Sequence, residues 1–262
     1  MMNILRCDVF SFSLLALILV IVPATAGTFL ADKTTRVSVA SDGVQANDYN
    51  AFPVISADGR YVAFQSYANN LVPEDSNEAL DIIVHDRTSG ETSRASLASD
   101  GSQGNDSSGN PAISADGRYV AFASAADNLV PGDSNGAFDI FVHDRASGET
   151  SRVSLASDGS QASNYSWYSA ISASGRYVAF ASAADNLVPG DSNGVIDTFV
   201  HDRVSHQTTR VSLASDSSQG NSDSWYPAIT ADGRLVAFQS WADNLVPGGN
   251  EGALDIFVSR QK

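Results

Sequence analysis

ISADGRYVAF, residues 113–122, is the stretch that decides the fold, because its pattern occurs four times in the chain. An identical copy begins at Ile55, and two close variants follow, ISASGRYVAF from Ile171 and ITADGRLVAF from Ile229. The copies are equally spaced, since 113 − 55, 171 − 113 and 229 − 171 are all 58. A fixed period of this length indicates four structural units of one kind.

Each copy has the pattern of a β-hairpin. RYVAF is a short apolar run, typical of a strand buried on both faces, and the Asp-Gly before it supplies the positive φ of a tight turn. Two further blocks repeat in phase, DIFVHDR (139–145) and TSRVSLASDG (150–159), and both alternate apolar with polar residues. We therefore predict that each unit is a four-stranded meander made of PAIS, RYVAFAS, DIFVHD and TSRVSL.

The repeated unit favours a ring. A small twisted sheet cannot bury both of its faces alone, whereas four equal sheets packed face to face around an axis can. The predicted fold is all-β, a four-bladed β-propeller of 58-residue repeats. The units are expected at about residues 41–98, 99–156, 157–214 and 215–262, with the last unit closed by residues 31–40.

Closure of the ring is expected to involve the N-terminal segment. The last unit contains LDIFVSR without a following TSRVSL-type strand, and ADKTTRVSV at residues 31–39 supplies that pattern. Residues 31–262 make 232 positions, which equals 4 × 58. An N-terminal strand is thus predicted to complete the last blade in a monomer. A dimer that forms an eight-bladed ring satisfies the same arithmetic, and a linear solenoid is the third alternative.

The motifs resemble a known repeat. ISADGRYVAF, DNLVPGDSNG, DIFVHDR and TSRVSLASDG are similar to the TolB-type, WD-like propeller repeat of exported bacterial proteins, over essentially the whole chain after Ala26. The unit is longer than the usual blade of that family because of the loop ANNLVPEDSNEA (68–79) and its counterparts. The resemblance implies a propeller in the cell envelope or outside the cell, most often a binding scaffold. It implies no single activity, because propellers carry unrelated functions.

Residues 1–26 have the pattern of a signal peptide. Arg6 precedes an apolar run at residues 10–22, and cleavage is predicted after Ala26. Residues 27–262 would then form a single domain in the periplasm or outside the cell, with a retained N-terminal anchor as the alternative. The only cysteine, Cys7, lies in the leader, so we expect no disulfide and no thiolate site in the mature chain.

The charge of the chain restricts its partners. Fifteen Lys and Arg residues against 30 Asp and Glu residues give a net charge of −15 and a pI near 4.4. Such a surface repels nucleic-acid phosphates and anionic lipids. We therefore expect no nucleic-acid partner and no membrane insertion after leader cleavage, which leaves proteins, neutral glycans and cations.

The loop before the third strand of each unit has part of a calcium-loop pattern. DSNGAFD offers carboxylate and amide oxygens two residues apart, with a glycine for the sharp turn and an aspartate that closes the loop. The alternative is an Asx turn in which these side chains bond their own backbone. The candidate calcium ligands are Asp133, Asn135, Asp139, Asp191, Asn193 and Asp197.

The HDR triplet that ends each third strand is interpreted as structural. His85, His143 and His201 stand at equivalent positions in different units, so they cannot converge on one metal ion. The Asp and Arg that follow are predicted to form an ion pair at the turn. The chain contains neither GxSxG nor HExxH, and no catalytic residue is predicted.

Aromatic residues mark the places where the four units differ. Units three and four carry Trp-Tyr at the entry to the first strand, where unit two has Gly-Asn. First strands of propellers line the central channel, so these rings are expected to cluster at one mouth of it, or else to fill the channel. Tyr67 and Trp241 are expected to be neighbours across the closed ring. The candidate ligand-binding residues are Phe52, Tyr67, Trp167, Tyr168, Trp225, Tyr226 and Trp241.

The sequence thus predicts an exported binding or scaffold module that mediates protein–protein interaction in the envelope or outside the cell. One alternative is a carbohydrate-binding or polysaccharide-active protein that uses the aromatic residues. Another is a structural surface protein whose acidic loops bind calcium for rigidity.

Overall fold

The computed structural model describes residues 34–249 and 252–261, and strands are its only regular secondary structure. Within these residues there is no helix of the length and hydropathy needed to cross a membrane. The predicted signal peptide lies outside the described residues. The described residues from Arg36 onward belong to one compact unit.

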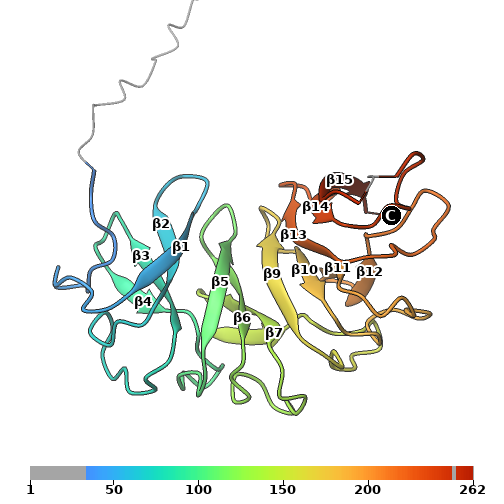
Figure 1. Ribbon diagram of the computed structural model, residues 1–262. Helices are drawn as coiled ribbons and strands as arrows, with labels where there is room; N and C mark the ends of the chain where they lie inside the picture. Colours follow the sequence, from blue (N-terminus) through green and yellow to red (C-terminus); the bar gives the residue numbers. More distant parts are fainter. Residues whose placement is uncertain (1–33, 250–251, 262) are drawn as a thin grey trace, which may run out of the picture. The chain divides into compact units, whose positions relative to one another are not determined.

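Fifteen strands form four separate antiparallel sheets that follow one another along the chain (Figure 1). The first sheet contains β1 (Asn50–Ile55), β2 (Tyr61–Ser66), β3 (Asp81–Asp86) and β4 (Thr92–Arg94). The second contains β5 (Ser108–Ile113), β6 (Tyr119–Ser124), β7 (Asp139–Asp144) and β8 (Glu149–Arg152). The third contains β9 (Ser166–Ile171), β10 (Tyr177–Ser182), β11 (Asp197–Asp202) and β12 (Gln207–Arg210). The fourth contains β13 (Ser224–Ile229), β14 (Leu235–Ser240) and β15 (Asp255–Arg260).

The predicted hairpin is confirmed in every unit. In the second sheet, the turn between β5 and β6 is closed by the Ser114 amide, which donates to the Tyr119 carbonyl at 2.9 Å. Gly117 takes the left-handed φ of +73° that the turn requires. Strand β6 is buried from its second residue onward, as expected for a strand covered on both faces.

The fourth strand is shorter than predicted. In the second sheet β8 ends at Arg152, and the next residue, Val153, packs into the core between the second and third sheets. The TSRVSL block is therefore divided between two units, because its polar start completes one sheet and its apolar end packs on the next.

Successive sheets pack face to face through apolar side chains of their inner strands. Ile140 and Val142 of β7 share a buried cluster with Val178 and Phe180 of β10. A similar cluster joins the first sheet to the second, and another joins the third to the fourth. Each fully buried side chain of this kind stabilises the fold by about 1.5–3 kcal/mol, so the core of the protein lies between sheets.

The fourth sheet differs from the other three. Among the described residues no strand pairs with the outer edge of β15, whereas β3, β7 and β11 each have an outer partner. Val37 packs against the core of the first sheet, and the Val39 carbonyl accepts a hydrogen bond from the Thr92 hydroxyl at 2.6 Å. The structure thus shows four sheets of the predicted propeller type, and the closed ring stays a prediction.

Candidate functional site

The first strand of every sheet contains a bulge with a left-handed non-glycine residue. The pairing of the first and second strands shifts register in all four sheets. The residues with positive φ at this point are Phe52 (51°), Asn110 (53°), Tyr168 (53°) and Tyr226 (50°). This backbone costs about 1–2 kcal/mol for a residue with a side chain, and such strain is concentrated at functional sites. The repeated bulge therefore marks the first strands as the candidate site.

The bulges of the third and fourth sheets bring two tyrosines together. The ring centroids of Tyr168 and Tyr226 are 4.0 Å apart, and their hydroxyl oxygens are 3.1 Å apart and hydrogen-bonded. This hydrogen bond raises the pKa of Tyr168. The ring centroids of Trp225 and Tyr226 are 6.5 Å apart, and Tyr226 is 53% exposed. We refer to Tyr168, Trp225 and Tyr226 as the tyrosine cluster.

Other predicted aromatic residues lie in separate pairs. Trp167 stacks on Tyr165 with centroids 5.4 Å apart and an interplanar angle of 12°. Tyr67 packs on Tyr49 with ring centroids 6.4 Å apart. Tyr165 and Tyr49 were not predicted, although they occupy equivalent positions just before the variable aromatic site of their units. Of the predicted aromatic residues, three thus form one group across two sheets. Two others each pair with a tyrosine of their own unit.

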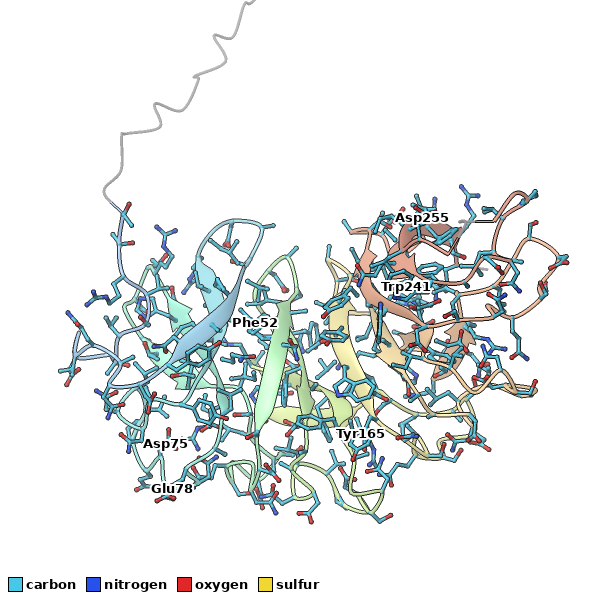
Figure 2. The ribbon with its side chains drawn as sticks, viewed as in Figure 1. Phe52, Asp75, Glu78, Tyr165, Trp241 and Asp255 are labelled. Atoms are coloured by element: carbon cyan, nitrogen blue, oxygen red, sulfur yellow. The ribbon has the colours of Figure 1, made fainter. Side chains whose placement is uncertain are left out.

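Two predicted residues lie apart from these groups. Phe52 is 56% exposed on β1 and Trp241 is 43% exposed just after β14 (Figure 2). Within the described part of the chain neither ring stacks on another aromatic ring. The predicted proximity of Tyr67 and Trp241 depends on closure of the four sheets into a ring and stays a prediction.

The predicted calcium loops hold an arginine between their carboxylates. In the third unit Arg210 Nη1 lies 2.8 Å from Asp191 and 2.9 Å from Asp197. The Asn193 amide donates to Asp197 at 2.8 Å, and the Ser212 hydroxyl donates to its other oxygen at 2.5 Å. The same group recurs around Asp133, Asp139 and Arg152 in the second unit, with Asn135 donating to Asp139.

Burial makes this arginine the counter-ion of the loop. The side chains of Asp191 and Asp197 are 4% and 1% exposed. Burial raises the pKa of Asp191, and the Arg210 guanidinium opposes that rise. A calcium ion at Asp133, Asn135 and Asp139, or at Asp191, Asn193 and Asp197, would compete with a guanidinium already in contact with the carboxylates. Calcium binding stays a prediction.

The aspartate of the HDR triplet has a different partner from the one predicted. Asp86 pairs with Arg60 from the hairpin turn, through Arg60 Nη2 and Asp86 Oδ2 at 2.7 Å. Arg87, the arginine of the triplet, donates instead to the Gly59 carbonyl at 2.7 Å. The predicted ion pair within the triplet is wrong, because adjacent residues of a strand point to opposite faces of the sheet.

The histidine of the triplet is a buried structural group, which agrees with the interpretation from sequence. His201 Nδ1 lies 2.8 Å from the Thr208 hydroxyl, which itself donates to the Leu155 carbonyl. Since that hydroxyl proton is already used, the imidazole must donate from Nδ1, which fixes the neutral tautomer. Burial, with nearby His206 adding to it, lowers the pKa of His201 to about 4.

Stability is expected to fall between pH 6.5 and 4 because of this histidine. The unfolded chain takes up a proton on His201 near pH 6.5, whereas the folded chain resists it down to about pH 4. The stabilisation is therefore complete above pH 6.5 and decreases as the pH falls, by at most about 3 kcal/mol. Urea unfolding of wild type and His201→Asn at pH 7 and pH 4.5 tests this. Equal losses in the two proteins would contradict the assignment.

Comparisons with known proteins identify the fold. No family model matches the chain, and no curated protein sequence matches it. A solved structure of putative TolB from Agrobacterium tumefaciens is similar at 17% identity and a TM-score of 0.51, over 82% of this chain and 60% of that one. TolB from Acinetobacter baumannii is similar at 17% identity and a TM-score of 0.49, over 83% of this chain and 44% of that one. The chain spans less than two thirds of either structure, and it has a TolB-like β-propeller fold.

Proposed function

We propose that the chain is an exported propeller module that binds a protein partner through the tyrosine cluster. The observation that carries this proposal is the contact of Tyr168 with Tyr226 at two strained bulges of neighbouring sheets. Tyr and Trp are enriched where protein interfaces have their largest energies. Exposed hydroxyls beside apolar rings give such a surface both apolar area and hydrogen-bonding groups.

The geometry favours a protein over a glycan. Tyr168 and Tyr226 lie with their ring centroids 4.0 Å apart, so each ring covers part of one face of the other, and this contact reduces the ring face that a sugar could stack on. Sugar stacking instead needs a free ring face. The net charge of −15 favours a partner segment that carries Lys or Arg, because complementary charge speeds encounter. We propose a basic protein segment as the ligand.

The module is proposed to act in the envelope or outside the cell as a closed ring of its four sheets. Export is supported by the signal-peptide pattern of residues 1–26. Closure is supported by the face-to-face packing of each sheet on the next, since the same packing between the fourth and first sheets would bury their remaining apolar faces.

Affinity capture from an envelope extract tests the proposed site. Wild type and a Tyr49→Ala/Tyr67→Ala control are expected to retain the same polypeptide, whereas Tyr168→Ala/Tyr226→Ala is expected to lose it. Truncation of two interface anchors of this kind weakens binding by about 100-fold or more. The retained species should be released by salt and destroyed by protease treatment of the extract.

Two results would contradict the proposal. Retention of the polypeptide by Tyr168→Ala/Tyr226→Ala, with an unchanged melting temperature, would exclude the tyrosine cluster as the site. Binding to a glycan array that depends on the same two tyrosines, without a protein ligand, would assign the site to carbohydrate instead.

A further inference from the structure

A contact between a tyrosine ring and an arginine recurs where successive sheets meet. The Arg203 guanidinium lies 4.6 Å from the ring centre of Tyr119 in the preceding sheet. Its Nη1 donates to the Gly175 carbonyl of the hairpin turn in its own sheet at 2.9 Å. Arg145 makes the same two contacts one sheet earlier, at 4.4 Å and 2.8 Å. Its partners are Tyr61 and Gly117.

Glutamine replaces this arginine where the third sheet meets the fourth. Gln261 stands one period of 58 residues after Arg203. The Gln261 amide donates to the Arg234 carbonyl at 2.9 Å, as the Arg203 amide does to the Arg176 carbonyl. The backbone therefore brings residue 261 to the same place beside the hairpin turn. The counterparts of Tyr119 and Gly175 are Tyr177 and Gly233.

A pocket of about 710 Å³ lies at this position, between the third and fourth sheets that Figure 1 shows side by side. Tyr177, Gly233 and Gln261 all line it. In the described part of the chain, the only guanidinium over the Tyr177 ring is that of Arg176, at 4.8 Å. Each of the two preceding tyrosines has two guanidiniums within 4.8 Å of its ring centre. The pocket thus keeps the ring and the turn carbonyl but has no arginine at the repeated position.

The carboxylates that favour a cation are also kept. The groove that holds Arg203 has Asp144 and Glu149 in its lining. The pocket beside Tyr177 has Asp202 and Asp232. One carboxylate of the outer strand is thus exchanged for one on the hairpin turn, and the number stays at two.

The two arginines of the pocket do not make it repel a cation. Arg176 is bound to Asp202 at 2.7 Å. The side chain of Arg234 is 80% exposed and lies 3.7 Å from Asp232, so solvent screens its charge. Two arginines and two aspartates give the lining no net charge.

We propose that this pocket binds an arginine side chain of a protein partner. The guanidinium lies against the Tyr177 ring and donates to the Gly233 carbonyl, as Arg203 does one sheet earlier. Arginine is favoured over lysine because its planar fork can stack on an aromatic ring while it donates a hydrogen bond in a fixed direction. The net charge of −15 favours the approach of such a partner.

This site goes beyond the proposed function, because the pocket is lined by residues other than those of the tyrosine cluster. Its lining residues all belong to the third and fourth units, so it does not depend on closure of the ring. The two proposals can therefore fail separately.

Titration of the full-length chain, exported by its own leader, with N-acetyl-arginine N-methylamide tests the site. In NMR spectra of wild type, saturable shifts are expected at the Gly233 amide and the Gln261 side-chain amide. The citrulline analogue, which lacks the charge, is expected to bind about 5- to 30-fold more weakly. No saturable shift at either position, or equal binding of the citrulline analogue, would overturn the proposal. Equal binding of the lysine analogue would overturn the choice of arginine.

Two substitutions exchange the two kinds of site. Gln261→Arg supplies the guanidinium from the chain itself, so it is expected to abolish the probe-induced shift at Gly233 and to raise the melting temperature by about 2–4 °C. Arg203→Gln is expected to create a second probe site, with a new saturable shift at Gly175. Arg234→Ala, at the exposed side of the pocket, is the control and should bind the probe at least as well as wild type. Unchanged probe binding by Gln261→Arg would overturn the proposal.

Two further measurements identify the source of the arginine. Tyr168→Ala/Tyr226→Ala should bind the probe like wild type, so a failure of the tyrosine cluster leaves this test intact. Sedimentation is expected to give the same mass for wild type and Gln261→Arg. Self-association of wild type that Gln261→Arg abolishes would assign the arginine to a second copy of the chain and overturn the assignment to a different protein.

Discussion

Arg210→Ala is expected to lower the free energy of unfolding by about 3–5 kcal/mol, because it leaves two buried carboxylates without a counter-ion. Arg210 contacts Asp191 at 2.8 Å and Asp197 at 2.9 Å, and all three side chains are at most 6% exposed. Urea unfolding at pH 7 measures the loss. A chain of this size should also melt about 6–20 °C lower.

The pH dependence identifies the cause of that loss. Burial raises the pKa of Asp191 above its usual range, with Arg210 opposing the rise. Without the arginine, the folded state should favour the protonated carboxyl more strongly, so the destabilisation should shrink as the pH falls from 7 towards 4. A loss that stays constant over this range would indicate lost packing rather than an uncompensated charge.

Two variants serve as controls for Arg210→Ala. Arg234 lies 3.7 Å from Asp232 with its side chain 80% exposed, so Arg234→Ala is expected to cost about 0–1 kcal/mol. Asp191→Asn in the Arg210→Ala background removes one of the orphaned charges and should recover part of the stability. Equal effects of Arg210→Ala and Arg234→Ala would contradict the buried ion pair.

Gly175→Ala is expected to destabilise the fold by about 3 kcal/mol, through backbone strain and a clash between sheets. Gly175 has a φ of +74°, and a Cβ there would lie 2.2 Å from Cδ2 of Tyr119 in the preceding sheet. The Tyr119 ring cannot easily move away, because the Arg203 guanidinium lies 4.6 Å from its centre. Thermal unfolding of the purified variant measures the effect.

Gly148→Ala separates the two causes. Gly148 has a nearly equal φ of +78°, and a Cβ there meets nothing within 4 Å. It should therefore show only the strain of a left-handed alanine, about 1–2 kcal/mol. Tyr119→Leu combined with Gly175→Ala should recover part of the larger loss. If Gly175→Ala and Gly148→Ala were equally destabilising, close packing of the tyrosine would play no part.

The strands and turns were predictable because their signals are local. RYVAF is a short apolar run and DIFVHD is a block of apolar and polar residues, both with β-branched residues, and both are buried strands in the structure. The Asp-Gly turn before Tyr119 has the positive φ that only glycine adopts freely. The β-propeller was predicted from these elements and their constant period, and its TolB-like type from the resemblance of the motifs.

The partners of the charged side chains were not predictable from spacing. Asp86 lies next to Arg87 in sequence but pairs with Arg60, which ends the preceding hairpin turn just before Tyr61, the residue opposite Asp86 in the strand register. Of the carboxylates interpreted as calcium ligands, Asp191 and Asp197 contact Arg210, which the spacing of the loop does not reveal. Each pair depends on which strands become neighbours, and many registers are compatible with the local pattern.

By itself the sequence determined the number of units, their strands and their turns, since alternation and turn chemistry act over a few residues. The tertiary structure decided which repeated positions meet. Tyr168 and Tyr226 occupy the same position of successive repeats and come within 4.0 Å only because their sheets are stacked and both first strands bulge. The physical reason is that side-chain contacts between units depend on sheet stacking and register, which no single repeat encodes.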